Sequence, residues 1–263
     1  MSLEVSPLLA NNTAGTVNAV AQLHRRAQRP NLYIKIPRTH AGVQAIEESI
    51  FAGVPVNVTL LFSREQYIAA AQAYMRGIER RIAARLDPKV SSVASIFVSR
   101  WDVAVKDQVP QEFHNRLGIA IAQRAYKAYR EILAAPRSRA LIAAGALSQR
   151  LLWASTGTKD PAAPDTLYVE ALAAPDTINT IPDKTLQGAD HGQLKKVMPV
   201  NGGDAEAVLA SFTRLGVDTA ALAVQLQREA TESFDKSWSD LLGRIASKSA
   251  RLGPGDQEHA GLS

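Results

Sequence analysis

The stretch NLYIKIPRT, residues 31–39, combines the pattern of a buried strand with a charged residue at its centre. Leu32, Ile34 and Ile36 alternate along it, so their side chains point to one face of a strand, whereas Lys35 points to the other face. A buried ammonium group without a partner loses its hydration and gains nothing in return. We therefore expect the face that carries Lys35 to hold other polar groups.

Short apolar strands recur along the chain after gaps that are long enough for a helix. We predict strands at 2–6, 32–37, 56–62, 93–99, 151–156 and 177–182. Apolar residues three or four positions apart predict helices at 13–28, 39–53, 64–86, 111–134, 136–145, 203–214 and 218–248. A helical crossover returns the chain to the same end of a sheet, so these strands should run parallel.

This order of elements predicts an α/β fold, and more specifically a (β/α)8 TIM barrel that is incomplete, with about six of the eight strands. We assign residues 1–250 to the barrel domain and residues 251–263 to a polar C-terminal tail that we expect to be disordered. An open doubly wound sheet is the alternative fold. That fold carries a glycine-rich phosphate loop after its first strand, and PLLANNTAGT (7–16) matches neither of the common fingerprints.

Polar residues share one face of the first four predicted strands. Glu4, Lys35, Asn57, Thr59 and Ser95 each alternate with apolar neighbours that point to the opposite face. Taken one at a time, such residues are typical of strand edges, turns or satisfied core positions. Unrelated polar residues are not expected to share one face, so the set predicts an active site at the mouth of a barrel.

Composition argues against several classes of protein. The net charge of +5 arises from 30 Lys and Arg against 25 Asp and Glu without a dense basic run, so we expect no nucleic-acid partner. The absence of cysteine excludes disulfides and thiolate chemistry, and the five histidines show no metal-ligand spacing, so we expect no metal and no other cofactor. Since no apolar run reaches about 18 residues, we expect a soluble, cytoplasmic protein without a membrane partner. The sequence does not decide the oligomeric state, and a homo-oligomer is possible.

A lysine in a largely apolar barrel is suited to nucleophilic chemistry. Burial disfavours the charged ammonium of Lys35 and frees the amine, which can form a Schiff base with a ketose. The protonated imine nitrogen then accepts the electron pair when the adjacent carbon–carbon bond breaks. Proton transfer needs an acid/base group, and Glu4 is the inward carboxylate among the predicted strands, with Thr59 able to share a water molecule with it.

Several motifs, in a fixed order, resemble the transaldolase family. They are NLYIKIPRTHAGVQAIEE (31–48), GVPVNVTLLFS (53–63), SIFVSRWD (95–102), WASTGTK (153–159) and DTINTIP (176–182). The resemblance runs from Ser2 to about residue 245 and is closest to the bacterial branch. It implies that Lys35 forms the Schiff base, that Glu4 and Thr59 hold the catalytic water, and that Asn57 and Ser95 contact the dihydroxyacetone unit.

The resemblance also implies small sugar phosphates as substrates. Arg100 corresponds to the family's phosphate-binding arginine, and Ser155 and Lys159 are candidates for a second phosphate position that many members fill with arginine. The implied reaction moves dihydroxyacetone from sedoheptulose 7-phosphate to glyceraldehyde 3-phosphate, in the pentose phosphate pathway.

The family has eight strands and an acid/base aspartate on the first, whereas this chain opens inside what resembles the third strand. We therefore expect two strands and that aspartate to be missing, with Met1 a misplaced start, and we expect the polar ending GPGDQEHAGLS (253–263) to be a natural terminus. The alternative function is a catalytically impaired sugar-phosphate-binding fragment of a transaldolase or of a transaldolase–isomerase fusion.

Overall fold

A computed structural model of the chain describes residues 1–188 and 197–251. In these residues a single sheet contains six parallel strands, which lie side by side in chain order. They are β1 (Ser2–Glu4), β2 (Tyr33–Pro37), β3 (Val56–Leu61), β4 (Ser92–Phe97), β5 (Arg150–Ala154) and β6 (Thr177–Asn179). Every predicted strand is present and begins within one residue of its predicted start, which confirms the number and starts of the strands. The predicted ends were too late by two residues for β1, β4 and β5 and by three for β6.

The strand order distinguishes between the two α/β folds. Each strand pairs with the next one along the chain, which is the order of an α/β barrel, whereas the order of a doubly wound sheet reverses at a switch point. Within the described residues β1 pairs only with β2 and β6 only with β5, so the sheet does not close. The fold is therefore barrel-like and open between its first and last described strands.

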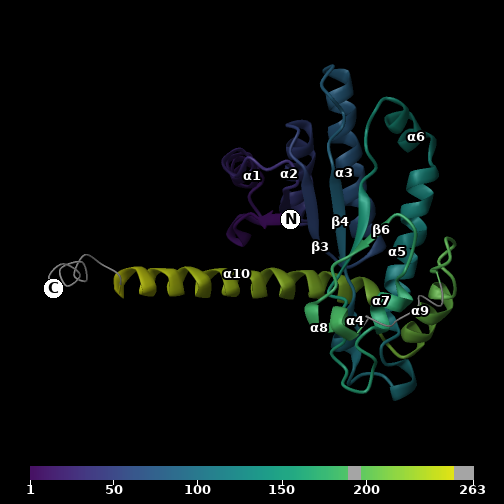
Figure 1. Cartoon of the computed structure of the whole chain (residues 1–263). Helices are drawn as coiled ribbons and strands as arrows, with labels where there is room; N and C mark the ends of the chain where they lie inside the picture. The colour runs from purple at the N-terminus through teal and green to yellow at the C-terminus, as the bar shows by residue number, and fades with distance from the viewer. Residues whose placement is uncertain (189–196, 252–263) are drawn as a thin grey trace.

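Helices connect the strands and follow the last of them. They are α1 (Thr13–Ala27), α2 (His40–Phe51), α3 (Arg64–Ala83), α4 (Ser99–Val105), α5 (Leu117–Ala134), α6 (Pro136–Ala143), α7 (Leu167–Ala171), α8 (Asp183–Gly188), α9 (Ala205–Arg214) and α10 (Thr219–Arg251), with 3-10 turns η1 (Pro7–Leu9) and η2 (Gln111–Phe113). Figure 1 shows α1, α2, α3 and α5 side by side in chain order. The side chains of Asn12, Thr39 and Ser63 cap the first three of these helices by accepting a backbone N–H.

The helix prediction for 111–134 is wrong at its start, and α4, α7 and α8 were not predicted. The helix begins at Leu117 because Asn115 adopts a left-handed conformation (φ 61°) and the carboxylate of Asp102 accepts the N–H groups of Leu117 and Gly118. A cap supplied from so far upstream lies outside any local sequence pattern. The predicted strand 93–99 ended too late, since α4 begins at Ser99 directly after β4.

The core lies between the sheet and these helices. Ile34, Ile36, Val56, Val58 and Ile96 are completely buried, as their alternation along the strands predicts. Val5 is also buried, but Leu3 on β1 is 41% exposed because its strand lies at the edge of the described sheet. The apolar faces of the strands thus form the core with the helices, and the polar side chains of the strands point to the opposite side of the sheet.

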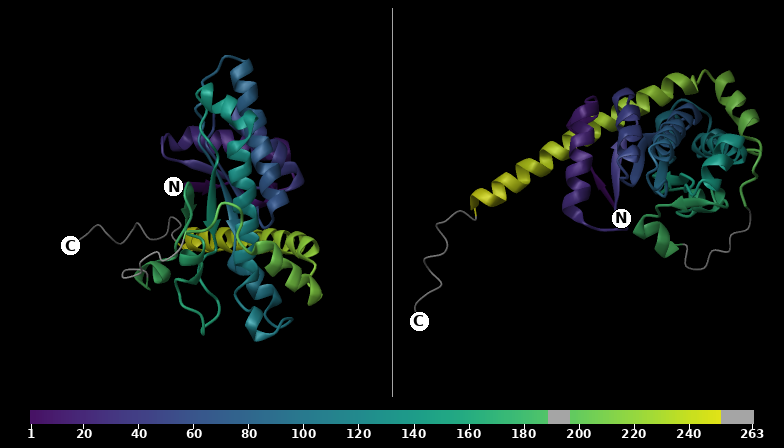
Figure 2. Two further views of the ribbon diagram at one scale, coloured as in Figure 1. Left: turned by 90° about the vertical axis from the view of Figure 1, so that its right-hand side faces the viewer. Right: turned by 90° about the horizontal axis from the view of Figure 1, so that it is seen from above.

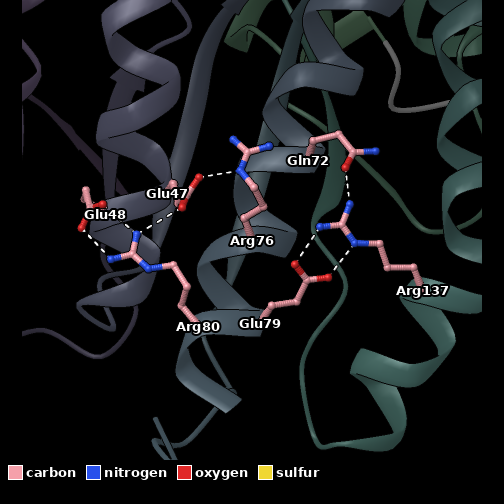
Figure 3. Close-up of polar contacts among 7 residues, drawn as sticks. All are labelled: Glu47, Glu48, Gln72, Arg76, Glu79, Arg80 and Arg137. Carbon is pink, nitrogen blue, oxygen red and sulfur yellow. Dashed lines mark hydrogen bonds and ion pairs between the residues drawn. The ribbon is translucent and has the colours of Figure 1, made fainter. Parts of the chain in front are cut away.

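A network of ion pairs joins three of the covering helices on their outer surface (Figure 3). Glu47 of α2 accepts from Arg76 and Arg80 of α3 at 2.5 and 3.1 Å, and Arg80 also forms a two-bond pair with Glu48. On the other side of α3, Glu79 and Gln72 accept from Arg137 of α6. Exposed pairs contribute little singly, but linked pairs hold the helices in register.

Helix α10 runs across the carboxyl ends of the strands. Figure 1 shows it nearly perpendicular to β3 and β4, and Figure 2 shows its C-terminal half extending beyond the rest of the protein. The Nε2 group of Gln227 donates to the carbonyls of Arg38 and Leu60, both at 2.8 Å, which ties α10 to the ends of β2 and β3. The predicted tail, residues 251–263, lies outside the described residues except for Arg251, the last residue of α10.

In the described ranges no single helix has the length and apolarity needed to cross a membrane. The bent pair α9 and α10, which meet at 91°, passes the same test of length and composition when taken together.

Candidate active site

The polar face of the sheet opens onto a cavity of about 470 Å³. Five residues that the sequence singled out line it together: Glu4, Lys35, Asn57, Thr59 and Ser95. The strand register explains this convergence, because Glu4 is paired with Lys35 and Lys35 with Asn57 across neighbouring strands. In a parallel sheet, paired residues point to the same face, so the three side chains form one row.

Lys35 and Glu4 form an ion pair at the centre of this row. The Nζ of Lys35 lies 3.5 Å from Oε2 of Glu4, and the two side chains are 24% and 29% exposed. Burial raises the pKa of Glu4, and the nearby charge of Lys35 only partly opposes this shift. The charged centre of NLYIKIPRT therefore has a partner, and the pair has access to solvent through the cavity.

A chain of hydrogen bonds orients the amide of Asn57. The hydroxyl of Ser95 donates to Oδ1 of Asn57 at 2.7 Å, and Nδ2 of Asn57 donates to the hydroxyl of Ser2 at 3.0 Å. The hydroxyl of Thr59 is buried and has no hydrogen-bond partner among the described residues. A buried hydroxyl without a partner is costly, so Thr59 is suited to bind a water molecule or a substrate hydroxyl.

The backbone beside Thr59 is irregular. Leu60 has φ +59°, a left-handed conformation that is unfavourable for leucine, and the register of β3 with β4 shifts between Val58 and Leu61. The carbonyl of Leu60 accepts from Gln227 of α10, which helps to hold this conformation. Strain of this kind is typical of functional sites, where a bulge redirects a side chain.

Arg100 lies on the first turn of α4, which follows β4, and is not itself among the residues that line the cavity. Its guanidinium group is 5.1 Å from the ring centre of Phe97, which lines the cavity. Burial lowers the pKa of Arg100, and Glu229 of α10 opposes this shift. Arg100 is thus a cation that contacts a residue of the cavity wall, Phe97.

The structure separates the two other candidates for phosphate binding. Ser155 adopts φ +57°, and its hydroxyl lies 2.9 Å from that of Ser99, the neighbour of Arg100 in the chain. Lys159 is exposed and lines a different cavity of about 110 Å³, together with Ser99, Asp102 and other residues. Ser155 is thus close to Arg100, whereas Lys159 does not line the cavity of Lys35.

Sequence reasoning missed an aromatic residue beside Lys35 and a buried carboxylate close to Arg100 in the chain. Phe234 of α10 places its ring centre 5.7 Å from Nζ of Lys35, although nearly 200 residues separate the two in the chain. Asp102, two residues after Arg100, is buried and also accepts a hydrogen bond of 2.8 Å from the hydroxyl of Tyr168. The motif SRWD contains this aspartate, but nothing local to it indicates that its partners are on α5 and α7.

In the described part of the chain no group of three or more His, Asp or Glu side chains is arranged so that it could hold a metal ion. The chemistry available to the cavity is that of an amine, a carboxylate with a raised pKa, hydroxyls and an amide. These groups, on one face of parallel strands in barrel order, define an α/β-barrel type of protein with a lysine-centred site.

Comparison with known proteins gives the family. Residues 1–245 match the family Transaldolase/Fructose-6-phosphate aldolase, and the chain belongs to this family. It is 43% identical to a transaldolase of Frankia alni, over 96% of this chain and 71% of the relative, and 43% identical to a transaldolase of Neisseria gonorrhoeae, over 93% and 70%. Transaldolase 1 of Streptomyces avermitilis is 44% identical over 94% and 68%. The predicted resemblance is confirmed, and the protein is an enzyme of the transaldolase type, a family that implies sugar-phosphate substrates.

Proposed function

We propose that this protein transfers a dihydroxyacetone unit from sedoheptulose 7-phosphate to glyceraldehyde 3-phosphate, giving erythrose 4-phosphate and fructose 6-phosphate. The observation that carries the proposal is the placement of the Lys35 amine beside Glu4, in a cavity that Asn57, Thr59 and Ser95 also line. We place this reaction in the pentose phosphate pathway and in the cytoplasm, with residues 1–250 as the catalytic domain.

In the proposed mechanism the Lys35 amine adds to the C2 carbonyl of the ketose and water leaves, which gives a protonated imine. The C3–C4 bond then breaks, its electron pair moves toward the imine nitrogen, and the C4 hydroxyl loses its proton as erythrose 4-phosphate departs. The resulting enamine carbon attacks the aldehyde carbon of glyceraldehyde 3-phosphate, whose oxygen takes up a proton. Water finally hydrolyses the imine and releases fructose 6-phosphate and the free amine.

Each lining residue has a role that matches its chemistry. Glu4 is the carboxylate that lines the cavity in the described residues, and its raised pKa suits a group that accepts and returns a proton through a water held by Thr59. Asn57 and Ser95, already joined by a hydrogen bond, bind hydroxyl groups of the dihydroxyacetone unit.

The phosphate groups are assigned to residues that follow β4 and β5. Arg100 binds phosphate through its guanidinium group, which matches the geometry of phosphate oxygens. Ser155 and Lys159 are proposed for the second phosphate position, with Ser155 the nearer to Arg100 through its contact with Ser99.

Borohydride trapping tests the proposal directly. Reduction in the presence of fructose 6-phosphate converts a Schiff base into a stable secondary amine, and mass spectrometry should locate the adduct on Lys35. Lys35→Met should lose both the adduct and turnover, whereas Lys89→Met, at an exposed lysine between α3 and β4, should retain both. An adduct on another lysine, or turnover by the Lys35→Met protein, would contradict the assignment.

A second candidate function is sugar-phosphate binding without turnover. It is favoured by the gap between β1 and β6, since Ser2 of β1 and Ile178 of β6 both line the cavity but belong to strands that do not pair in the described residues. Binding of fructose 6-phosphate without any borohydride adduct would support this candidate over the first.

A further inference from the structure

A second cavity, of about 340 Å³, lies between α3, α5 and the first turns of α10. It shares no lining residue with the cavity of Lys35. Three arginines line it, Arg38, Arg64 and Arg124, and Glu65 is the acidic residue among the described lining residues. Three arginines and one glutamate line this cavity, whereas the cavity of Lys35 is lined by one lysine and one glutamate.

Arg38 is the residue that gives this cavity its unusual character. It follows β2 directly, its backbone N–H donates to the carbonyl of Thr59, and its own carbonyl accepts from Gln227. Its Nε atom is buried and has no hydrogen-bond partner, and no carboxylate lies within ion-pair distance of its guanidinium, in both cases among the described residues. Arg38 as a whole is half-buried, but a buried donor atom without an acceptor is costly, so an anion that accepts a hydrogen bond from this Nε would be stabilised here.

The two other arginines are held at the same cavity by acidic neighbours. Arg124 donates two hydrogen bonds to Glu206 of α9, and Arg64 pairs with Glu65 at 2.7 Å. The carboxylates of Glu65 and Glu206 are about two-thirds exposed, so solvent screens their charge. Gln66 uses its carbonyl oxygen to accept the N–H of Phe62, which leaves its amide NH2 group as a further donor at this cavity.

We propose that this cavity is a binding site for a small phosphorylated anion, separate from the sugar-phosphate site. Arginine matches phosphate oxygens with paired hydrogen bonds, and three guanidinium groups suit a dianionic phosphate better than a carboxylate. The volume exceeds that of one phosphate group and falls in the range of small-molecule sites. The bound anion would link α10, through Gln227, to the segment that follows the strand of Lys35.

Pyrophosphate is the probe for the test, and Arg100→Ala is the background, since it removes the phosphate-binding arginine of the proposed active site. Titration calorimetry of the Arg100→Ala variant should give one binding site for pyrophosphate. The double variant Arg100→Ala, Arg38→Gln should bind pyrophosphate about tenfold more weakly or worse. The control double variant Arg100→Ala, Arg139→Gln, which changes an exposed arginine of α6, should bind pyrophosphate as tightly as Arg100→Ala alone. Melting curves without ligand check that each variant is folded.

Two results would overturn the proposal: no binding in the Arg100→Ala background, or equal affinity with and without Arg38→Gln. If Arg38→Gln does not fold, chemical protection gives the decision. Pyrophosphate should slow modification of Arg38 and Arg64 by phenylglyoxal, followed by mass spectrometry, without slowing that of Arg139. Equal rates with and without pyrophosphate would refute the site, whatever the outcome of the Schiff-base experiment.

Discussion

Replacing Asp102 by asparagine should change how stability depends on pH. Burial raises the pKa of Asp102 from its ordinary value of 3.8 to about 6, even though hydrogen bonds from Tyr168, Gly118 and Leu117 lower it. The folded state therefore holds a proton on this group at pH values where the unfolded chain has released it. The free energy of unfolding falls as pH rises between these two values, and the loss is complete above about pH 6.

The size of the effect follows from the two pKa values. A shift of about 2 pH units corresponds to a loss of about 3 kcal/mol over the whole titration. About 2 kcal/mol of this falls between about pH 4.5 and about pH 7.5, where unfolding is practical to measure. Asparagine does not titrate, so the stability of Asp102→Asn relative to the wild type should rise by this amount across that interval. Any cost of misplaced hydrogen bonds in the variant is a constant offset.

Denaturant unfolding followed by tryptophan fluorescence is a suitable assay, because Trp101 adjoins Asp102 and is completely buried. Asp107→Asn, at an exposed aspartate just after α4, is the matched control, and its curve should run parallel to that of the wild type. Parallel curves for Asp102→Asn and the wild type would show that the hydrogen bonds balance the effect of burial. Curves that diverge in the opposite direction would show that the hydrogen bonds dominate and that the reasoning is wrong.

Further predictions concern the active site and the sheet. Arg100→Ala should lower kcat/KM for phosphorylated substrates by the equivalent of about 2–3 kcal/mol, and by far less for unphosphorylated analogues. Lys159→Ala should show a smaller effect of the same kind. Equal losses for both substrate types would mean that Arg100 has a structural role. Glu4→Gln should remove the acid limb of the kcat/KM profile, which the raised pKa of Glu4 places above the ordinary range of glutamate, and an unchanged limb would exclude Glu4 as its source. Phe234→Leu, which keeps an apolar side chain but removes the aromatic ring, should lower the rate of borohydride trapping at Lys35 about as much as Phe234→Ala does, and a wild-type rate in Phe234→Leu would deny the ring a role. The 263-residue chain should aggregate more readily than the Frankia alni transaldolase and convert substrate more slowly, because β1 and β6 each leave one edge unpaired in the described residues. Equal light scattering and equal turnover rates for the two proteins would contradict this.

The sequence alone determined the strands, their parallel order and the face on which the polar residues lie. Alternation along a strand is a local property, so the positions of Glu4, Lys35, Asn57, Thr59 and Ser95 within their strands were enough to assign all five to one face. The starts of the helices that Asn12, Thr39 and Ser63 cap are also a local property of the sequence, since each side chain accepts an N–H three residues later.

Only the tertiary structure decided which distant residues complete these local patterns. The start of α5 depends on Asp102, which is brought to it by the packing of α4 and not by any neighbour in the chain. Phe234 reaches Lys35 because α10 crosses the ends of the strands, and Arg38 joins Arg64 and Arg124 because the same helix closes the cavity between them. Periodicity specifies the face of an element but not its partner, because the partner is selected by the packing of the whole chain.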